Sequence, residues 1–509
     1  MIKRLLIANR GEIAIRIAQA ASELGIATVG IYSEDDATSL HVKRVDEAVV
    51  LGGRGSAAYL DITAVVTAAR STRCDAIHPG YGFLSENAGL ASACAEAKIA
   101  FVGPTPEQLE LFGDKARARA QAEKSKVPVL PGTDGAVDVA GAIAFFKKHA
   151  KSGIALKAIA GGGGRGMRLV THEGDIADAF ARASAEAQSA FGNGTLYAER
   201  LVRQARHIEV QIVGDGKGGI AALGERECSL QRRSQKIVDA ATAMAKAVRY
   251  RSLGTFEFLV DGNDFFFIEA NPRLQVEHTV TEEVWGVDLV QLQLRGELPK
   301  GATPHGAAIQ LRVNMETMTE DGSAKPGGGT LTVFEPPSGP GVRVDTYGYA
   351  GYRTNPNFDS LLAKVIVKGP SFDAALARAE RALASFRLEG APSNIGFLRA
   401  LLADKDVRTD KVHTRFVDEH AKKLIAAAVK LDGGRYFQAA ATPSPGSRQV
   451  GARVDAVDPL AVLSFGKAAA QPVAQDASSD APEGTVPVPA PMQGTIVSLS
   501  VKEGDAVAA

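Results

Sequence analysis

Five polar residues alternate along one short segment near the middle of the chain: Glu269, Asn271, Arg273, Gln275 and Glu277. In an extended strand successive side chains point to opposite faces, so this spacing predicts that all five lie on one side. An apolar core does not accept such a row without partners, because each uncompensated buried charge costs several kcal/mol. We therefore interpret the row as the floor of an active site. A solvated face is the alternative.

The segment before the row predicts a second strand, residues 255–260, joined to it by a hairpin. A three-residue loop, 262–264, places Glu257 opposite Glu269, and the two carboxylates then converge with the Asn271 amide. Hard oxygen ligands of this kind suit Mg²⁺, which is commonly bound by one or two carboxylates plus substrate phosphates. A loop of even length would instead turn Glu257 to the opposite face and weaken the metal hypothesis.

The end of the row offers groups for a small planar anion. Arg273 and Gln275 can donate hydrogen bonds to such an anion, and Glu277 can accept its proton. Thr279 and Glu282 have the spacing of a capping box, which predicts that a helix begins directly after the row.

A run of glycines, residues 161–166 (GGGGRG), lies between two predicted strands, residues 154–159 and 167–170. Glycine backbone exposes successive N–H groups to a phosphate at close range, because no Cβ intervenes. No helix pattern follows and no Gly-Lys-Ser/Thr is present, so the context supports neither a Rossmann nor a Walker loop. A loop without a ligand is the alternative. Lys157 on the preceding strand favours phosphate binding, because it supplies a counter-charge.

The composition of the 509-residue chain limits its partners and its compartment. Lys plus Arg and Asp plus Glu number 58 each, so no net charge favours nucleic acid or a membrane. Three cysteines are too few for a disulfide framework and fit a reducing compartment. No apolar run approaches the roughly 18 residues of a membrane helix. We expect a soluble, cytoplasmic protein, with a processed organellar chain as the alternative.

Strand and helix patterns predict a chain of several modules with α/β and α+β character. Residues 1–105 alternate strands and helices, which indicates a Rossmann-like domain with a parallel sheet, and residues 106–300 carry the glycine run and the polar row. Residues 301–431 predict a mostly antiparallel C-terminal module. Residues 432–485, rich in Ala, Pro and Ser, predict a flexible linker, and a partial β domain follows at 486–509.

A dense charged segment, residues 225–236 (ERECSLQRRSQK), is by itself as consistent with a solvated surface loop as with a binding site. We interpret Cys228 within it as a small buried residue, because no base for a nucleophilic thiol is evident. The histidines lack metal-ligand spacing, so no zinc site is predicted.

Taken together, five motifs closely resemble biotin carboxylase. They are residues 7–14 (IANRGEIA), 78–87 (HPGYGFLSEN), 161–167 (GGGGRGM), 225–236 and 269–282 (EANPRLQVEHTVTE). The resemblance runs from Met1 to about Leu431 and implies that residues 106–300 form an ATP-grasp domain. It also implies a ligase that carboxylates biotin with ATP and bicarbonate, using Mg²⁺ or Mn²⁺.

The resemblance implies roles for individual residues. It assigns ATP binding to Lys115, Lys157, Gly161, Gly162, Gly163, Gly164, Arg165, Gly166, Glu199, His207, Gln231 and Ser234. It assigns the metal to Glu257, Glu269 and Asn271, and bicarbonate to Arg273, Gln275 and Val276. It makes Glu277 the general base, Lys236 a contact of carboxyphosphate, and Arg343 the residue that stabilises the biotin enolate.

The sequence departs from the family pattern at three places. Ser234 stands where many relatives have histidine, which affects one nucleotide contact. After Val238 the chain passes quickly to Ala240, without the acidic, Pro-containing stretch that is usual there. Residues 310–316 (QLRVNME) also differ from the more usual pattern, which indicates a subfamily.

Residues 487–497 (PVPAPMQGTIV) resemble the start of a biotin carboxyl carrier domain, without the biotin-bearing Met-Lys-Met. A carrier so soon after the carboxylase favours an acyl-CoA carboxylase over the pyruvate enzyme, in which the transferase comes between. Expected partners are a carrier domain, a carboxyltransferase, bicarbonate and further copies of the chain. The alternatives are a pyruvate or urea carboxylase component, another ATP-grasp ligase, or a regulatory nucleotide-binding subunit.

Overall fold

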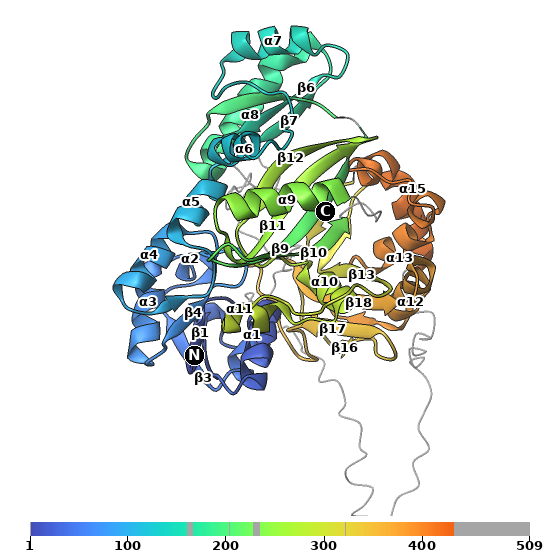
Figure 1. Ribbon diagram of the computed structural model, residues 1–509. Coiled ribbons are helices and arrows are strands. Elements are labelled where there is room, and N and C mark those ends of the chain that lie inside the picture. Colours follow the sequence, from blue (N-terminus) through green and yellow to red (C-terminus); the bar gives the residue numbers. More distant parts are fainter. Residues whose placement is uncertain (1, 160–165, 203, 228–234, 321, 432–509) are drawn as a thin grey trace, which may run out of the picture. The chain divides into compact units, whose positions relative to one another are not determined.

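The computed structural model describes residues 2–159, 166–202, 204–227, 235–320 and 322–431 (Figure 1). Contacts divide the chain into two units, Met1–Gln438 and Ala439–Ala509, and the described residues all belong to the first. Several predictions lie outside the described residues: the linker 432–485, the partial domain 486–509, and the roles of residues 161–165, Cys228, Gln231 and Ser234.

The first module is built on a parallel sheet, as predicted. Its strands lie in the order β3-β2-β1-β4-β5, with bounds β1 Arg4–Ile7, β2 Ala27–Ser33, β3 Glu47–Leu51, β4 Ala76–His78 and β5 Ala100–Phe101. Leu5 and Ile7 pack against α1 (Gly11–Glu23), and Leu6 belongs to the cluster on the other face. The remaining helices of this module are α2 Gly55–Ala58, α3 Ile62–Ser71 and α4 Ala88–Glu96. A strand buried on both faces has to be apolar throughout, which explains the unbroken apolar run in β1.

A small antiparallel sheet carries the predicted glycine hairpin. Its order is β7-β6-β8, with β6 Ile154–Ala158, β7 Met167–Val170 and β8 Leu196–Arg200. Lys157 pairs with Met167, so the hairpin predicted around the glycine run is confirmed for its two strands. Helices α5 Pro106–Gly113 and α6 Lys115–Lys124 precede this sheet along the chain, and α7 Val139–Lys148 and α8 Ile176–Phe191 flank it.

The central sheet has one apolar and one polar face. It is antiparallel in the order β10-β9-β11-β12, with β9 Arg206–Asp215, β10 Ile220–Glu227, β11 Arg251–Asp261 and β12 Asp264–Asn271. Helix α9 (Gln235–Ala247) runs across this sheet in Figure 1. Its Met244 belongs to the same hydrophobic cluster as Ile208 and Phe256 of the sheet. Glu209 and Glu257 alternate with these residues, so strand periodicity turns them to the other face.

The β11–β12 hairpin has the predicted pairing of Glu257 with Glu269, but its loop differs from the predicted one. Asp261 pairs with Asp264, so the loop has two residues and the predicted three-residue loop is wrong. Gly262, at φ +60, occupies the first central position, where two-residue hairpin turns favour glycine. A bulge at Ile268 then shifts the register by one residue, and Glu257 faces Glu269 as predicted.

The last module combines a three-stranded antiparallel sheet with helices, as predicted. The order is β13-β18-β17, with β13 Ala307–Asn314, β17 Val342–Thr346 and β18 Leu361–Gly369. Short ladders join β14 Glu316–Met318 to β15 Ala324–Pro326, and β16 Val333–Glu335 to β19 Arg387–Glu389. Its helices are α12 Phe372–Ser385, α13 Ile395–Ala403, α14 Lys405–Arg408 and α15 Phe416–Leu431. Helices α10 His278–Trp285 and α11 Leu289–Arg295 lead into this module from the central sheet.

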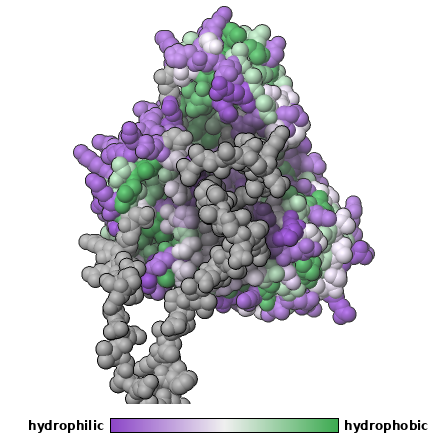
Figure 2. Space-filling model, turned by 180° about the vertical axis from the view of Figure 1, so that it is seen from behind, coloured by the Kyte–Doolittle hydropathy of each residue, from purple (hydrophilic) through white to green (hydrophobic). Residues whose placement is uncertain are grey.

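Hydrophilic and hydrophobic residues are interspersed over the face seen in Figure 2. None of the helices within the described ranges combines the length and the apolar character needed to cross a membrane. Cys74 and Cys94 are buried free thiols.

Candidate active site

The polar row does not continue as one strand. β12 ends at Asn271, and the chain turns over residues 272–277 before α10 begins at His278. Pro272 has no N–H for a ladder, and the Arg273 N–H instead donates to the Asn271 carbonyl oxygen at 2.8 Å. The strict alternation predicted beyond Asn271 is therefore wrong. The helix directly after the row is confirmed. Its N-cap residue is Glu277, without a side-chain capping hydrogen bond, so the predicted capping box of Thr279 and Glu282 is wrong.

Two side chains of the row, those of Asn271 and Gln275, nevertheless meet at the buried Glu257 carboxylate. Oε1 of Glu257 accepts hydrogen bonds from Asn271 Nδ2 and from Gln275 Nε2, the latter at 2.9 Å. Its Oε2 lies 2.6 Å from Nε2 of His207 on β9. The Glu257 carboxylate thus contacts three residues to which the family resemblance gives different ligands: Asn271 for the metal, Gln275 for bicarbonate and His207 for ATP.

A second group of predicted residues lies at the other end of this site. Lys157 Nζ on β6 lies 2.5 Å from Glu199 Oε2 on β8, and Lys115 Nζ lies 3.3 Å from Glu269 Oε2. Burial, and then the negative charges of Glu199 and Glu269, raise the pKa of Tyr197 well above its ordinary value. Lys115 at the start of α6 therefore lies close to one predicted metal carboxylate, Glu269, whereas Lys157 lies close to Glu199, another predicted ATP contact.

Glu257, Glu269 and Asn271 fit a magnesium site in register and chemistry. The two glutamates are direct cross-strand partners, and Asn271 follows two residues later on the same strand. Among the described residues no group of three or more His, Cys, Asp and Glu side chains forms a metal cluster. A pair of carboxylates with one amide is a smaller set, of the kind that Mg²⁺ completes with water and phosphate oxygens.

The predicted bicarbonate residues follow one another through the turn. Arg273 donates from Nη2 to Asn271 Oδ1 at 3.1 Å, and its Nε forms an ion pair with Glu86. The Val276 carbonyl oxygen accepts from Nζ of the buried Lys364 at 3.3 Å. The turn is thus fastened to the first module by Glu86 and to the last module by Lys364.

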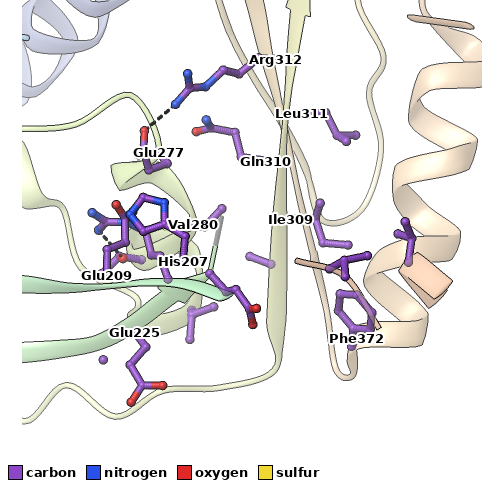
Figure 3. A pocket seen from close by; sticks show the side chains of 18 of the residues that line it. His207, Glu209, Glu225, Glu277, Val280, Ile309, Gln310, Leu311, Arg312 and Phe372 are labelled. Carbon is purple, nitrogen blue, oxygen red and sulfur yellow. Dashed lines mark hydrogen bonds and ion pairs between the residues drawn. The ribbon is translucent and has the colours of Figure 1, made fainter. Parts of the chain in front are cut away.

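Glu277, the predicted base, lies opposite Arg312 of β13, as Figure 3 shows. Oε2 of Glu277 lies 2.8 Å from Nη2 of Arg312, and the two side chains are 19% and 49% exposed. Burial raises the pKa of Glu277, but the charges of Arg312, Arg226 and Arg273 outweigh burial and hold this pKa below its ordinary value. The carboxyl is therefore ionised near neutral pH and can accept a proton.

Arg343, the residue predicted to stabilise the enolate, is not brought to Glu277. Its Nη1 lies 2.9 Å from Glu282 Oε2, and its Nε lies 2.8 Å from Asp345 Oδ1. The guanidinium is thus engaged by carboxylates of α10 and of its own strand β17. The arginine that contacts Glu277 is instead Arg312 of β13, the opposite edge strand of the same sheet.

Arg312 is the residue that the sequence analysis missed. The signal was present in the unusual 310–316 motif, where Arg312 is an exposed residue between the buried Leu311 and Val313. Arg312 is the single cation of β13, as Lys157 is the single cation of β6.

Lys236 lies at the start of α9, directly after residues that lie outside the described ranges. It is exposed in the first turn of α9, and within the described ranges no ion pair of its ammonium is observed. Its neighbours Gln235 and Val238 line a cavity that also reaches Glu277, whereas Lys236 does not.

That cavity has a volume of about 1220 Å³ and changes character along its length (Figure 3). Its polar end contains Glu277, Arg312, Glu209 and His207. Its apolar end is lined by residues of β13 and the C-terminal helices, among them Ile309, Leu311, Phe372, Leu402 and Phe416. It borders the start of α9, where the sequence lacks the acidic, Pro-containing stretch.

The charged segment 225–236 is not a solvated loop at its described N-terminal end. Arg226 is only 4% exposed and contacts five polar side chains on the polar face of the sheet. Its partner Glu209 is fully buried. Burial raises the pKa of Glu209 to about 7. The positive charge of Arg226 opposes this rise, and the negative charges of Glu277 and Glu257 add to it.

Comparison with known proteins identifies the modules. The family model of the biotin carboxylase N-terminal domain matches residues 1–109, and that of the biotin carboxylase C-terminal domain matches 310–419. Between them, the ATP-binding domain of the carbamoyl-phosphate synthase L chain matches in two segments, 114–245 and 236–301. These two segments overlap at the start of α9, at the place where the sequence departs from the family pattern.

Two curated relatives cover most of the chain. It is 42% identical over 445 residues to a biotin carboxylase of Nostoc, a match that covers 82% of this chain and 99% of the relative. It is 43% identical over 466 residues to a pyruvate carboxylase of Staphylococcus aureus, covering 85% of this chain. The chain spans only 40% of that longer relative.

Solved structures give the same result. The biotin carboxylase domain dimer of a Hydrogenobacter thermophilus 2-oxoglutarate carboxylase, with MgADP and bicarbonate, matches with a TM-score of 0.79 and 39% identity. That match covers 83% of this chain and 99% of the domain. A single-chain, multi-domain long-chain acyl-CoA carboxylase matches with a TM-score of 0.72 and 44% identity, over 84% of this chain and 43% of the other. The chain therefore belongs to the biotin carboxylase family and contains its ATP-grasp module.

Proposed function

We propose that this chain carboxylates biotin held on a carrier protein, using ATP and bicarbonate, as the first half-reaction of an acyl-CoA carboxylase. The observation that carries the proposal is the Glu257 cluster, in which Asn271, Gln275 and His207 meet one carboxylate. Such a cluster joins a nucleotide and metal site to a site for a small anion. The turn that follows ends in Glu277, an ionised base.

The chemistry requires bicarbonate to be activated. Bicarbonate is a poor electrophile, so one of its oxygens attacks the γ-phosphorus of ATP, and the bond from that phosphorus to ADP breaks. Glu277 takes the proton of bicarbonate as this bond forms. Arg273 and the Gln275 amide hold the anion in place, which is the main contribution of a protein to such a step.

The nucleotide is held at the other end of the site. Lys115 and Lys157 neutralise phosphate charge, and the Gly161–Gly166 loop supplies backbone N–H donors. Glu257, Glu269 and Asn271 would hold Mg²⁺ or Mn²⁺. A bound metal ion neutralises charge on the phosphates during transfer.

The second stage makes carboxybiotin. Carboxyphosphate breaks into carbon dioxide and phosphate, the phosphate takes the ureido proton of biotin, and the resulting enolate attacks carbon dioxide through nitrogen. A cation beside the enolate oxygen stabilises this step. We assign that cation to Arg312 rather than Arg343, because Arg312 adjoins Glu277 and is half exposed.

The domain division and the partners belong to the same proposal. The parallel sheet β3-β2-β1-β4-β5, the two sheets of the middle region and the sheet β13-β18-β17 support domains at residues 1–105, 106–300 and 301–431. A carrier domain, a carboxyltransferase and a second copy of the chain are the proposed partners. The dimer in the 2-oxoglutarate carboxylase match supports the last of these.

The acyl-CoA context is the finer part of the proposal. It is supported by the carrier-like residues 487–497 and by the similarity to a long-chain acyl-CoA carboxylase. A biotin carboxylase component of a pyruvate carboxylase is the second candidate, favoured by 43% identity to the Staphylococcus aureus enzyme. A carboxyl-transfer assay of the assembled enzyme distinguishes the two candidates. Transfer to acyl-CoA supports the first, and transfer to pyruvate supports the second.

Bicarbonate-dependent ATP hydrolysis, stimulated by free biotin, tests the proposed reaction. We expect ADP release to require bicarbonate and to rise with biotin. ATP hydrolysis without either dependence would indicate a different ATP-grasp ligase. ATP binding without any hydrolysis would indicate a regulatory subunit.

A further inference from the structure

Arg226 is the most fully satisfied cation on the polar face of the central sheet. Its Nε donates to Glu209 Oε1 at 2.5 Å. Its Nη1 donates to Gln211 Oε1 at 2.6 Å and to Thr281 Oγ1 at 3.1 Å. Its Nη2 donates to Thr255 Oγ1 at 2.9 Å and to Gln275 Oε1 at 2.8 Å. A guanidinium has five N–H donors in a rigid fork, and here each has an acceptor.

The contact with Gln275 fixes which end of that amide faces the Glu257 cluster. A side-chain amide can turn over and exchange its oxygen with its nitrogen, so its orientation depends on its neighbours. Arg226 carries only donors, so a turned amide would place two donor groups against each other. The Gln275 oxygen must therefore face Arg226, and its Nε2 must face Glu257.

We infer that Arg226 is a positioning residue for bicarbonate, which acts by holding the Gln275 oxygen toward itself and the Gln275 Nε2 on the Glu257 side of the site. The inference rests on the proposed function, because it needs Gln275 to bind bicarbonate. Arg226 touches neither bicarbonate nor ATP in this scheme. Its effect passes through one neighbouring side chain.

A second feature shows what else depends on Arg226. Glu209 is fully buried, and its Oε2 has no hydrogen-bond partner in the described part of the chain. Removing the guanidinium leaves this carboxylate uncompensated and lowers stability. A loss of activity alone would therefore not distinguish positioning from folding, and the test has to separate the two.

The test compares Arg226→Lys and Arg226→Gln with the unmodified chain in bicarbonate-dependent ATP hydrolysis. We expect KM for bicarbonate to rise about tenfold or more, the effect of losing a hydrogen bond from a charged group. We expect KM for ATP to change less than about threefold, since Lys115 and Lys157 are untouched. Equal increases in both KM values would overturn the inference.

Arg399→Lys is the matched control for loss of a buried guanidinium. Arg399 is buried, pairs with Glu380 and donates to the Leu431 carbonyl oxygen in the C-terminal helices. We expect this variant to lower the melting temperature and to leave KM for bicarbonate unchanged. A rise in this KM comparable to that of Arg226→Lys would show that the effect is general destabilisation.

A double-mutant cycle tests whether the effect passes through Gln275. We expect Arg226→Lys to add little to KM for bicarbonate in a Gln275→Met background, because coupled residues are not additive. Full additivity would overturn the inference. Should the Arg226 variants not fold, Gln275→Met by itself decides, since an unchanged KM for bicarbonate also overturns it. Absence of any bicarbonate dependence in the unmodified chain would instead refute the proposed function.

Discussion

The Glu257 cluster and the Glu277–Arg312 pair lie at the two ends of the same turn and differ in how completely their charges are satisfied. Glu257 is buried and accepts from Asn271 and Gln275 while it contacts His207. Glu277 faces one guanidinium beside a large cavity. Side chains saturated with partners are held in position, whereas side chains with access to a cavity are free to exchange a proton or meet a substrate. We therefore expect the first cluster to govern binding and the second pair to govern turnover.

The largest expected effect comes from removing the base. Glu277→Gln keeps the size of the side chain and should lower kcat for bicarbonate-dependent ATP hydrolysis by about 10² or more, as general-base catalysis predicts. Stability should change little, because the pair with Arg312 is partly exposed. Steady-state kinetics with a melting curve checks both. A variant that keeps more than about a third of kcat would refute the division between the two ends of the turn.

Arg312→Met and Arg343→Met compare an arginine that is half exposed and pairs with Glu277 with an arginine that is held by Glu282 and Asp345. Arg312→Met should lower kcat for carboxylation of free biotin by about 10², with little change in stability, because it removes charge stabilisation of the enolate. Arg343→Met should mainly destabilise the chain, by about 3 kcal/mol, because Glu282 and Asp345 lose their partner.

Carboxylation assays and denaturant unfolding of the two arginine variants provide the measurement. The opposite pattern would restore Arg343 as the residue beside the enolate.

Glu257→Gln tests whether the Glu257 cluster binds the metal ion. The Mg²⁺ concentration for half-maximal activity should rise about tenfold or more, while the kcat at saturating Mg²⁺ should fall less than in Glu277→Gln. Metal titration of ATP hydrolysis provides the measurement, with Glu110→Gln on the exposed surface of α5 as control. An unchanged metal requirement would remove Glu257 from the metal site.

The smallest expected effect is a shift in pH dependence. The charge of Arg312 helps to hold the pKa of Glu277 below its ordinary value, against burial. In Arg312→Met this pKa should rise, so the acidic limb of kcat/KM for bicarbonate should move to higher pH. A profile recorded from acid to neutral pH tests the direction. An unmoved limb would mean that another group titrates.

The sequence was sufficient for the class of each module and for the two strands of the glycine hairpin. The predicted strand 154–159 corresponds closely to β6, because burial on one or both faces imposes a local pattern. The pairing of Glu257 with Glu269 was also predicted, but from a loop length that was wrong. The two-residue loop shifts the register by one residue from the prediction, and the bulge at Ile268 shifts it back. The sequence around Ile268 has no feature that predicts a bulge.

The neighbours of individual charges were less predictable. The turn at 272–277 was missed although Pro272 was visible, because the alternation of polar residues suggested continued strand. Arg343 and Arg312 could not be ranked by residue type, since both are cations on strands of one sheet. Arg226 was interpreted as equally consistent with a solvated loop, yet it is buried.

The amino-acid sequence by itself determined the family, the modules and the set of chemical groups, because motifs and periodicity are properties of neighbouring residues. Tertiary structure decided which arginine contacts Glu277 and which end of the Gln275 amide faces Glu257. Those outcomes depend on how β13 and the 272–277 turn pack against the central sheet, and packing joins residues that are far apart in the chain.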